Sequence, residues 1–420
     1  MNVYHVHRRV LLASLVGTAV EFYDFYIYAT AAALVFGPLF FPATSPSAQL
    51  MLAYASFGIA FVARPVGAAL FGHFGDRVGR KSTLVASLLL MGGATVLIGF
   101  LPTYASAGWA APLLLCLLRF SQGLGLGGEW GGAALLAVEN APAGYRARFG
   151  MFPQLGAPVG FIAANGLFLI LSSTFSDADF LAWGWRIPFV LSAVLVGLGL
   201  WVRTKLADTP AFAALSHEAP QAAIPLVELF RTSLRQTLAG TCAVIVCFAI
   251  YYLTTAFALG YGTKTLGFAS RDFLSVQLIA ILFMAAGIVM SGYAADKWSS
   301  RAVLMGGSVG AILVGIAMGP AFHSGSLATI GLFLSFGLLT MGFVYGPLAE
   351  LLPQLFTPEV RYTGASIAFN VGGIIGGGFA PGVAQALVDR GGVLYVGAYI
   401  AAAAVLTLVG LLSISRSPAR

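Results

Sequence analysis

Long apolar stretches separated by short polar ones run along nearly the whole 420-residue chain. A helix that crosses a bilayer needs about 20 mainly apolar residues, because each helical residue rises about 1.5 Å. On this criterion we expect an all-α membrane protein. The sequence predicts twelve transmembrane helices, near residues 9–38, 48–72, 82–101, 110–139, 147–173, 184–203, 235–262, 271–295, 301–321, 326–352, 360–389 and 392–414.

The longest polar interval, residues 204–234, divides the predicted helices into two sets of six. It predicts an N-terminal six-helix bundle over 1–203, a cytoplasmic linker over 204–234 and a C-terminal six-helix bundle over 235–420. The two sets also repeat, because the segment 72–81 recurs 220 positions later as 292–301. A ladder of small residues at 156, 160 and 164 recurs 216 positions later, where Gln154 corresponds to Asn370. Two parallel repeats are typical of transporters whose halves rock about a midplane site.

Composition and charge agree with a membrane location. Hydrophobic residues make up 59% of the chain and charged residues 9%, which excludes a soluble globular domain. The net charge of +7 does not indicate nucleic-acid binding, because the basic residues are scattered singly between apolar segments. Sixteen of the 22 Lys and Arg residues lie in termini and predicted loops on the side of the membrane that holds the N-terminus. The positive-inside rule therefore predicts a multi-pass inner-membrane protein with both termini in the cytoplasm.

Two carboxylates, Glu21 and Asp24, interrupt the first apolar segment. Residues three apart lie about 60° apart on a helix, so both face one side, together with Tyr28. An acid near the middle of a bilayer costs at least about 2.5 kcal/mol, so it faces a bundle interior or a wet cavity. Such a group titrates, pairs with a cation, or does both. The alternative is a structural ion pair that locks two helices.

Two arginines within predicted helices, Arg64 and Arg119, supply the matching cations. Depth along the helices predicts a pair between Asp24 and Arg119, and a second pair between Arg64 and either Glu21 or Glu129. Protonating a carboxylate releases its arginine, which can then bind an anionic substrate. We therefore expect these three acids to be proton-coupling candidates, with Asp24 first, and the two arginines to be carboxylate clamps. The alternative for each arginine is a fixed counter-ion.

The second six-helix set carries almost no buried charge, so we expect it to bind the neutral hydroxyl groups or ring of the substrate. The repeat-related Gln154 and Asn370 either flank the substrate or satisfy helix-breaking neighbours. Glycines at 123, 127 and 131 on one helix predict close helix packing rather than a phosphate-binding loop. The predicted substrate-binding residues are Arg119, Arg64, Tyr28, Gln122, Gln154, Tyr251 and Asn370.

Several motifs together give the chain a clear resemblance to a known family. The segment from Gly72 to Lys81 resembles the signature of the major facilitator superfamily. Segments 21–25, 63–67, 71–77, 119–123, 127–132 and 360–365 resemble the metabolite:proton symporter family, and the first helix is most similar to the shikimate-transporter branch. The resemblance implies the two-bundle major facilitator fold. It also implies a cytoplasmic gate formed by Asp76, Arg77, Arg80 and Glu139.

The resemblance and the buried charges imply a proton-coupled symporter that imports shikimate or a related carboxylate by alternating access. A symporter of dicarboxylates or tricarboxylates such as 2-oxoglutarate or citrate is the second choice, and a betaine or proline symporter is another alternative. Sodium is the alternative coupling ion. We expect no enzyme activity, no cofactor besides protons, and a monomer in the lipid bilayer. In the second half, Ser299 and Ser300 replace Gly79 and Arg80, so we expect a weaker gate there.

Overall fold

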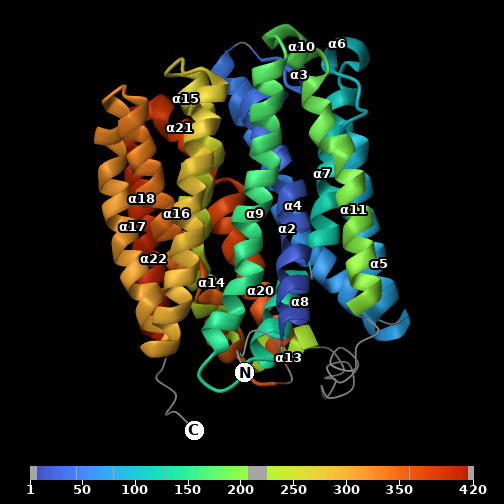
Figure 1. Cartoon of the computed structure of the whole chain (residues 1–420), viewed down its shortest axis with the longest axis vertical. Coiled ribbons are helices and arrows are strands. Elements are labelled where there is room, and N and C mark those ends of the chain that lie inside the picture. Colours follow the sequence, from blue (N-terminus) through green and yellow to red (C-terminus); the bar gives the residue numbers. More distant parts are fainter. Residues whose placement is uncertain are drawn as a thin grey trace.

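A computed structural model describes residues 7–43, 45–78, 80–127, 129–206, 225–358 and 360–414. Long helices stand side by side along one axis (Figure 1). The first part of the chain forms α2 (Arg8–Ala31), η1 (Ala32–Phe36), α3 (Gly37–Phe40), α4 (Pro46–Val78), α5 (Arg80–Ile98), α6 (Tyr104–Ala107), α7 (Ala110–Leu126), α8 (Glu129–Glu139), α9 (Arg146–Thr174), α10 (Asp177–Ala182), η2 (Gly184–Arg186) and α11 (Ile187–Leu206). We call these elements the N-half.

The second part of the chain is built in the same way. It forms α13 (Pro225–Thr232), α14 (Leu234–Tyr252), η3 (Leu253–Phe257), α15 (Ala258–Lys264), α16 (Ser270–Lys297), α17 (Ser300–His323), α18 (Leu327–Tyr345), α19 (Leu348–Gln354), α20 (Arg361–Gly373), η4 (Ile374–Gly378), α21 (Ala380–Gly391) and α22 (Val393–Ser413). We call the elements from α14 to α22 the C-half. Much of the predicted linker lies outside the described residues, and the predicted domain boundaries stay a prediction.

The described ranges contain eleven helical spans long and apolar enough to cross a membrane. Each matches a predicted helix to within a few residues. The twelfth predicted helix, 82–101, corresponds to α5, in which Val85–Ile98 is a shorter apolar helix. The fold is therefore the expected all-α membrane bundle.

The ladder of small residues packs corresponding pairs of helices together in the two halves: α9 on α2 in the N-half, and α20 with η4 on α14 in the C-half. A Cβ atom added to Gly156 on α9 would lie 2.0 Å from Thr18 Oγ1 on α2. A Cβ atom added to Gly376 in η4 would lie 2.2 Å from the Ile245 carbonyl oxygen on α14. In both halves, small residues let two backbones approach more closely than a larger side chain permits.

Three of the long helices contain a π-helical segment that the sequence did not predict: η1, η3 and η4. η1 follows α2 and η3 follows α14, so they occupy corresponding places in the two halves, where they contact each other. Extra residues of this kind within α-helices occur frequently at functional sites. Their position places an irregular backbone between the two halves.

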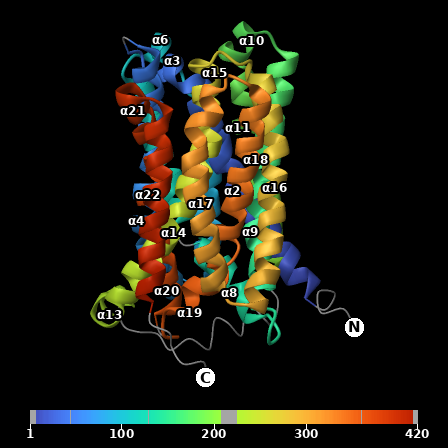
Figure 2. The ribbon, with the colours of Figure 1, turned by 90° about the vertical axis from the view of Figure 1, so that its left-hand side faces the viewer.

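The halves meet along two seams: α9 packs on α16, and α4 packs on α20, η4 and α21. The beginning of α2 and the end of α22 lie at the same end of the bundle as α8, α13 and α19 (Figure 2). We call this the terminal end, and the opposite end, with α3, α6, α10 and α15, the far end (Figures 1 and 2).

Candidate transport site

Two buried arginines share one aromatic ring near the centre of the bundle. The guanidinium carbon of Arg119 on α7 lies 4.3 Å from the centre of the Phe25 ring, and that of Arg64 on α4 lies 4.6 Å from it. Arg119 is 0% exposed and Arg64 8% exposed. The ring faces attract the two cations. Nη2 of Arg119 and Nε of Arg64 are buried and donate to no acceptor among the described residues.

Glycines position these two arginines by bringing α4 and α7 together. A Cβ atom on Gly127 would lie 2.1 Å from the Arg64 carbonyl oxygen, and one on Gly123 would lie 2.3 Å from the Ala60 carbonyl oxygen. Gly67 on α4 faces α7 in the same way, because its added Cβ atom would lie 2.0 Å from the Leu124 carbonyl oxygen. The predicted packing role of the glycines on this helix is confirmed.

Asp24 is 1% exposed and accepts hydrogen bonds from two other helices. Ser192 Oγ on α11 donates to Asp24 Oδ1 over 2.5 Å, and Thr95 Oγ1 on α5 donates to Asp24 Oδ2 over 3.2 Å. Gln122 Nε2 on α7 donates to Thr95 Oγ1 over 2.7 Å. Arg119 Nη1 in turn donates to Gln122 Oε1 over 2.9 Å.

The structure corrects the predicted direct pair between Asp24 and Arg119. Among the described residues the two groups form no ion pair, and they are joined instead through Gln122 and Thr95. Depth along the helices could not show that α5 inserts a threonine between the two groups. Gln122, predicted to bind substrate, is a member of this chain of hydrogen bonds.

The other predicted charged partner of the site is Glu21, which is half-buried and interacts electrostatically with Arg64. This is one of the two pairings that the sequence left open for Arg64. The side chain of Glu129, the other choice, lies outside the described part of the chain. Tyr28 lies against Arg119, with its ring centre 4.1 Å from the guanidinium carbon, and its hydroxyl hydrogen-bonds to Ser56 Oγ over 2.8 Å.

Gln154 and Asn370 join the two halves rather than flank an open site. Gln154 Nε2 donates to the Tyr345 carbonyl oxygen over 2.8 Å, and its Oε1 accepts from Trp130 Nε1 over 3.1 Å. Asn370 Nδ2 donates to the Gly127 carbonyl oxygen over 3.0 Å. Each amide therefore reaches from its own half to a backbone oxygen of the other. The sequence did not predict these contacts, because it does not show how the halves face each other, and a substrate-flanking role for either amide stays a prediction.

Tyr251 lines a small cavity between the halves. Its ring stacks on Tyr26 with ring centres 5.2 Å apart. The cavity has a free volume of about 10 Å³, room for about one water molecule. Its polar lining consists of Tyr26, Thr30, Asn165, Tyr251, Thr255 and Gln277. Thr30 and Asn165 were missed at the sequence level, because single polar residues in apolar helices carry no distinctive pattern.

At the terminal end, Glu139 forms an ion pair with Arg361, with 3.6 Å between Oε1 and Nη1. Glu139 belongs to the N-half and Arg361 to the C-half, so this ion pair connects a residue of the predicted gate to the other half of the molecule. The side chains of Asp76, Arg77 and Arg80 lie outside the described part of the chain, and their gate roles stay a prediction.

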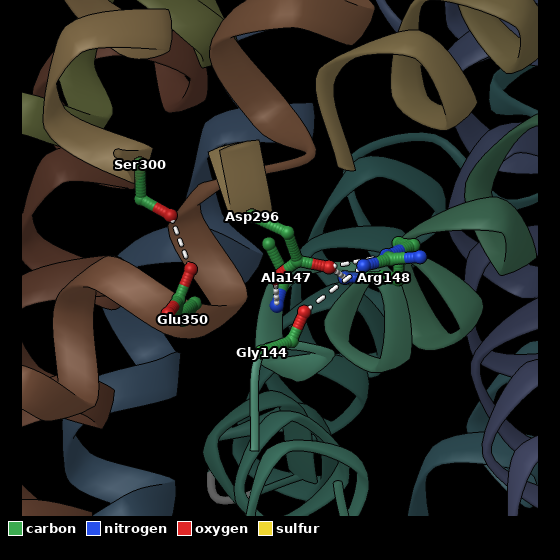
Figure 3. Close-up of polar contacts among 6 residues, drawn as sticks. All are labelled: Gly144, Ala147, Arg148, Asp296, Ser300 and Glu350. Atoms are coloured by element: carbon green, nitrogen blue, oxygen red, sulfur yellow. Dashed lines mark hydrogen bonds and ion pairs between the residues drawn. The ribbon is translucent and has the colours of Figure 1, made fainter. Parts of the chain in front are cut away.

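A second contact at the terminal end comes from Asp296, the last acid of α16 (Figure 3). Its Oδ1 accepts from the Ala147 backbone N–H over 2.9 Å. Its Oδ2 accepts from Arg148 Nε over 2.6 Å and from the Arg148 backbone N–H over 3.2 Å. A carboxylate of the C-half thus caps the first turn of α9 in the N-half, where the helix dipole favours negative charge. Beside it, Ser300 hydrogen-bonds to Glu350 within the C-half (Figure 3).

The far end is closed as well. Tyr54 Oη on α4 donates to the Ala256 carbonyl oxygen in η3 over 2.7 Å. Ser47 Oγ on α4 donates to Asp389 Oδ2 on α21 over 2.6 Å. With these contacts between the halves at both ends, the described part of the chain is in a closed conformation.

Apolar helices in two similar halves, with buried charges among them, are typical of membrane transporters. The family model described as Sugar (and other) transporter matches residues 10–228. The chain belongs to this family, and it has the major facilitator fold.

The chain is similar to transporters along almost its whole length. It is 49% identical to the inner membrane metabolite transport protein YhjE of Escherichia coli (strain K12), over 96% of this chain and 93% of that protein. It is 37% identical to the shikimate transporter of the same organism, over 91% and 88% of the two chains. The crystal structure of a D-xylose-proton symporter covers 97% of each chain with a TM-score of 0.73 at 17% identity, which shows the shared fold. The protein is therefore a multi-pass inner-membrane secondary transporter of metabolites and not an enzyme.

Proposed function

We propose that this transporter imports a small organic acid together with protons. The observation that carries the proposal is the pair of buried arginines on Phe25, each with a nitrogen that donates to no described acceptor. A buried cation with unused donors is costly unless a partner arrives. Guanidinium groups match the geometry of a carboxylate, which can accept two parallel hydrogen bonds from one arginine. A carboxylate substrate would therefore compensate these donors.

The neutral part of the substrate would face the C-half. Tyr251 and Gln277 lie on the same side of the small cavity as Thr255, and Gln277 Oε1 is buried without a described donor. Hydroxyl groups on a cyclic acid could donate to such an acceptor. Shikimate or a related hydroxy acid is our first choice, because a shikimate transporter is 37% identical to this chain. A dicarboxylate or tricarboxylate such as 2-oxoglutarate or citrate is the second choice.

Asp24 is the proposed proton acceptor. It is 1% exposed and lies at the end of a hydrogen-bond chain that begins at Arg119. An ionised carboxylate can only accept these hydrogen bonds, so gaining a proton changes which bonds the chain can form. We propose protons as the only coupling species, a monomer as the working unit, and cytoplasmic locations for both termini.

The anion part of this proposal is tested by uptake of shikimate, 2-oxoglutarate, citrate and betaine into proteoliposomes. Arg119→Lys keeps the charge but removes the planar fork, so we expect uptake of the carboxylate substrate to fall by at least about tenfold. The matched control is Arg271→Lys, at an exposed arginine at the far end. Uptake of betaine alone, or normal carboxylate uptake by Arg119→Lys and Arg64→Lys, would refute the proposal.

A further inference from the structure

One chain of hydrogen bonds runs from Arg119 through Gln122 and Thr95 to Asp24. Arginine has only donors, so the group of Gln122 that faces Arg119 must be its carbonyl oxygen Oε1. Gln122 Nε2 must then point the other way, where it donates to Thr95 Oγ1. Thr95 can donate its hydroxyl proton to Asp24 Oδ2. When it does so, every donor in the chain points from the cation towards the anion.

The chain is shielded from water along its whole length. Arg119, Thr95 and Ser192 are 0% exposed, and Gln122 and Asp24 are 1% exposed. In such surroundings aligned hydrogen bonds polarise and strengthen one another, and water cannot replace a lost one. The negative charge of Asp24 thus acts on Arg119 through two neutral side chains, although the two charged groups form no described ion pair.

Thr95 is placed where the chain can be broken. Its hydroxyl has one proton and two acceptors: Asp24 Oδ2 at 3.2 Å and the Met91 carbonyl oxygen at 2.9 Å. While Asp24 is ionised, its charge attracts the Thr95 proton. Once Asp24 is protonated, that attraction is lost, and the backbone oxygen of Met91 is the better acceptor. The Thr95 proton then turns to the Met91 oxygen, the hydrogen bond between Thr95 and Asp24 is lost, and the charge of Asp24 no longer polarises the bonds that run through Gln122 to Arg119.

We propose that Thr95 and Gln122 are positioning residues that transmit the protonation state of Asp24 to Arg119. This inference rests on the proposed function, because it takes Asp24 as the proton acceptor and Arg119 as the substrate clamp. Ser192 holds the second oxygen of Asp24, so that Oδ2 faces Thr95. The protonation state of Asp24 on α2 can then change the hydrogen bonding of Arg119 on α7 without direct contact between the two side chains.

Other charged or titratable groups also face this region, and the proposal leaves them their own roles. The described ones include Glu21, Tyr23, Tyr26 and Tyr28 on α2, Arg64 on α4, Cys116 on α7, Tyr251 and Tyr252 on α14, and Tyr345 on α18. Thr95 and Ser192, which contact Asp24 directly, do not titrate in the physiological range. A change at Thr95 therefore alters the connection between charges without altering any charge.

The test separates two activities of the same proteoliposomes. One is exchange of labelled substrate across the membrane without a proton gradient, and the other is accumulation driven by an imposed pH difference. The substrate is the acid that drives uptake in the screen of shikimate, 2-oxoglutarate and citrate. Thr95→Val has nearly the same shape as threonine but no hydroxyl. We expect it to retain exchange within about twofold and to lose accumulation by at least about tenfold, since a hydrogen bond to a charged group is lost.

Thr95→Ser restores the hydroxyl and should restore accumulation. Gln122→Met interrupts the chain at its other member and should also lose accumulation by at least about tenfold, which keeps the test valid if one variant does not fold. The matched control is Thr407→Val, which removes a hydroxyl that is equally buried in the C-half, where it donates to the Cys242 carbonyl oxygen. This control should retain both activities.

Two kinds of result would overturn the relay. Accumulation at the wild-type level in Thr95→Val would show that the hydroxyl transmits nothing. Equal loss of exchange and accumulation in Thr95→Val, with Thr407→Val intact, would show a structural role. Failure of the proposed function is distinct, because Asp24→Asn would then still accumulate substrate, or the wild-type protein would show no accumulation driven by the pH difference.

Discussion

Asp296 offers the sharpest test of how the closed conformation is held at the terminal end. We consider Asp296→Asn, which keeps the shape of the side chain and removes its charge. The carboxylate is 4% exposed and accepts three hydrogen bonds from the first turn of α9, one of them from the Arg148 guanidinium group. The asparagine has a single acceptor oxygen, so it can satisfy only part of this set.

The expected size of the effect follows from these contacts. A hydrogen bond between charged partners contributes about 1.5–3 kcal/mol, and a helix N-cap contributes about 1 kcal/mol. Part of the cap survives in Asn, so the loss should be about 1.5–3 kcal/mol. Because this contact joins the two halves, the loss should shift the equilibrium towards conformations open at the terminal end on the order of ten- to hundredfold.

Distances between spin labels can measure this shift. We would label cysteines introduced at the exposed residues Arg146 and Trp298, in a protein that lacks the three native cysteines. Asp296→Asn should increase the population with a longer distance. Asp272→Asn makes the same chemical change in an exposed ion pair at the other end of α16, and it should leave the distribution unchanged. An unchanged distribution in Asp296→Asn would refute the reasoning that this contact holds the halves together.

Two further predictions concern the packing of the halves and of their helices. Gly127→Ala should lower thermal stability and carboxylate uptake strongly, because its Cβ atom would lie 2.1 Å from a backbone oxygen of α4, whereas Gly93→Ala has open space and should be neutral in both assays. Equal melting temperatures for these two variants would contradict the close approach of α4 and α7. Asn370→Leu and Gln154→Leu should each destabilise the closed conformation by about 1–3 kcal/mol, because each leaves a buried backbone oxygen unpaired. The label distances described above would measure this, and unchanged distances in both variants would contradict it.

The positions of the helices were predictable because the bilayer imposes a length and an apolar composition on every span. What the sequence did not reveal is where these helices depart from regular geometry. The π segments η1 (Ala32–Phe36) and η4 (Ile374–Gly378) consist of ordinary apolar residues and glycines, and η3 adds two threonines to apolar residues. Their irregularity arises from tertiary packing, which local composition does not encode.

The charged residues of the site were predictable because a buried charge is costly and therefore conspicuous. Asp24, Arg64 and Arg119 are all buried. The connecting residues were not predictable. Thr95 looks like many threonines in apolar helices, whose hydroxyl donates to the carbonyl oxygen four residues earlier, and it does form that bond. Only the arrangement of α5 beside α2 shows its second acceptor, Asp24.

The gate shows a similar limit. The sequence predicted a weaker gate in the second half because the counterpart of Arg80 is a serine. In the structure, Asp296 receives its arginine, Arg148, from the other half of the molecule. Aligning the two repeats shows which residues correspond to each other. It does not show that a residue of one half, such as Asp296, has its partner in the other half. Which gate is stronger stays a prediction.

The central claim is proton-coupled transport of an organic acid, and proton flux in proteoliposomes tests it most directly. We would add shikimate, 2-oxoglutarate, citrate and betaine in turn and record the external pH, with wild-type protein and with Asp24→Asn. The account predicts that one acid makes the external solution more alkaline, and that Asp24→Asn abolishes this while binding of the acid survives. Substrate exchange without any proton movement would contradict the account, because Asp24 and Arg119 would then be structural groups only.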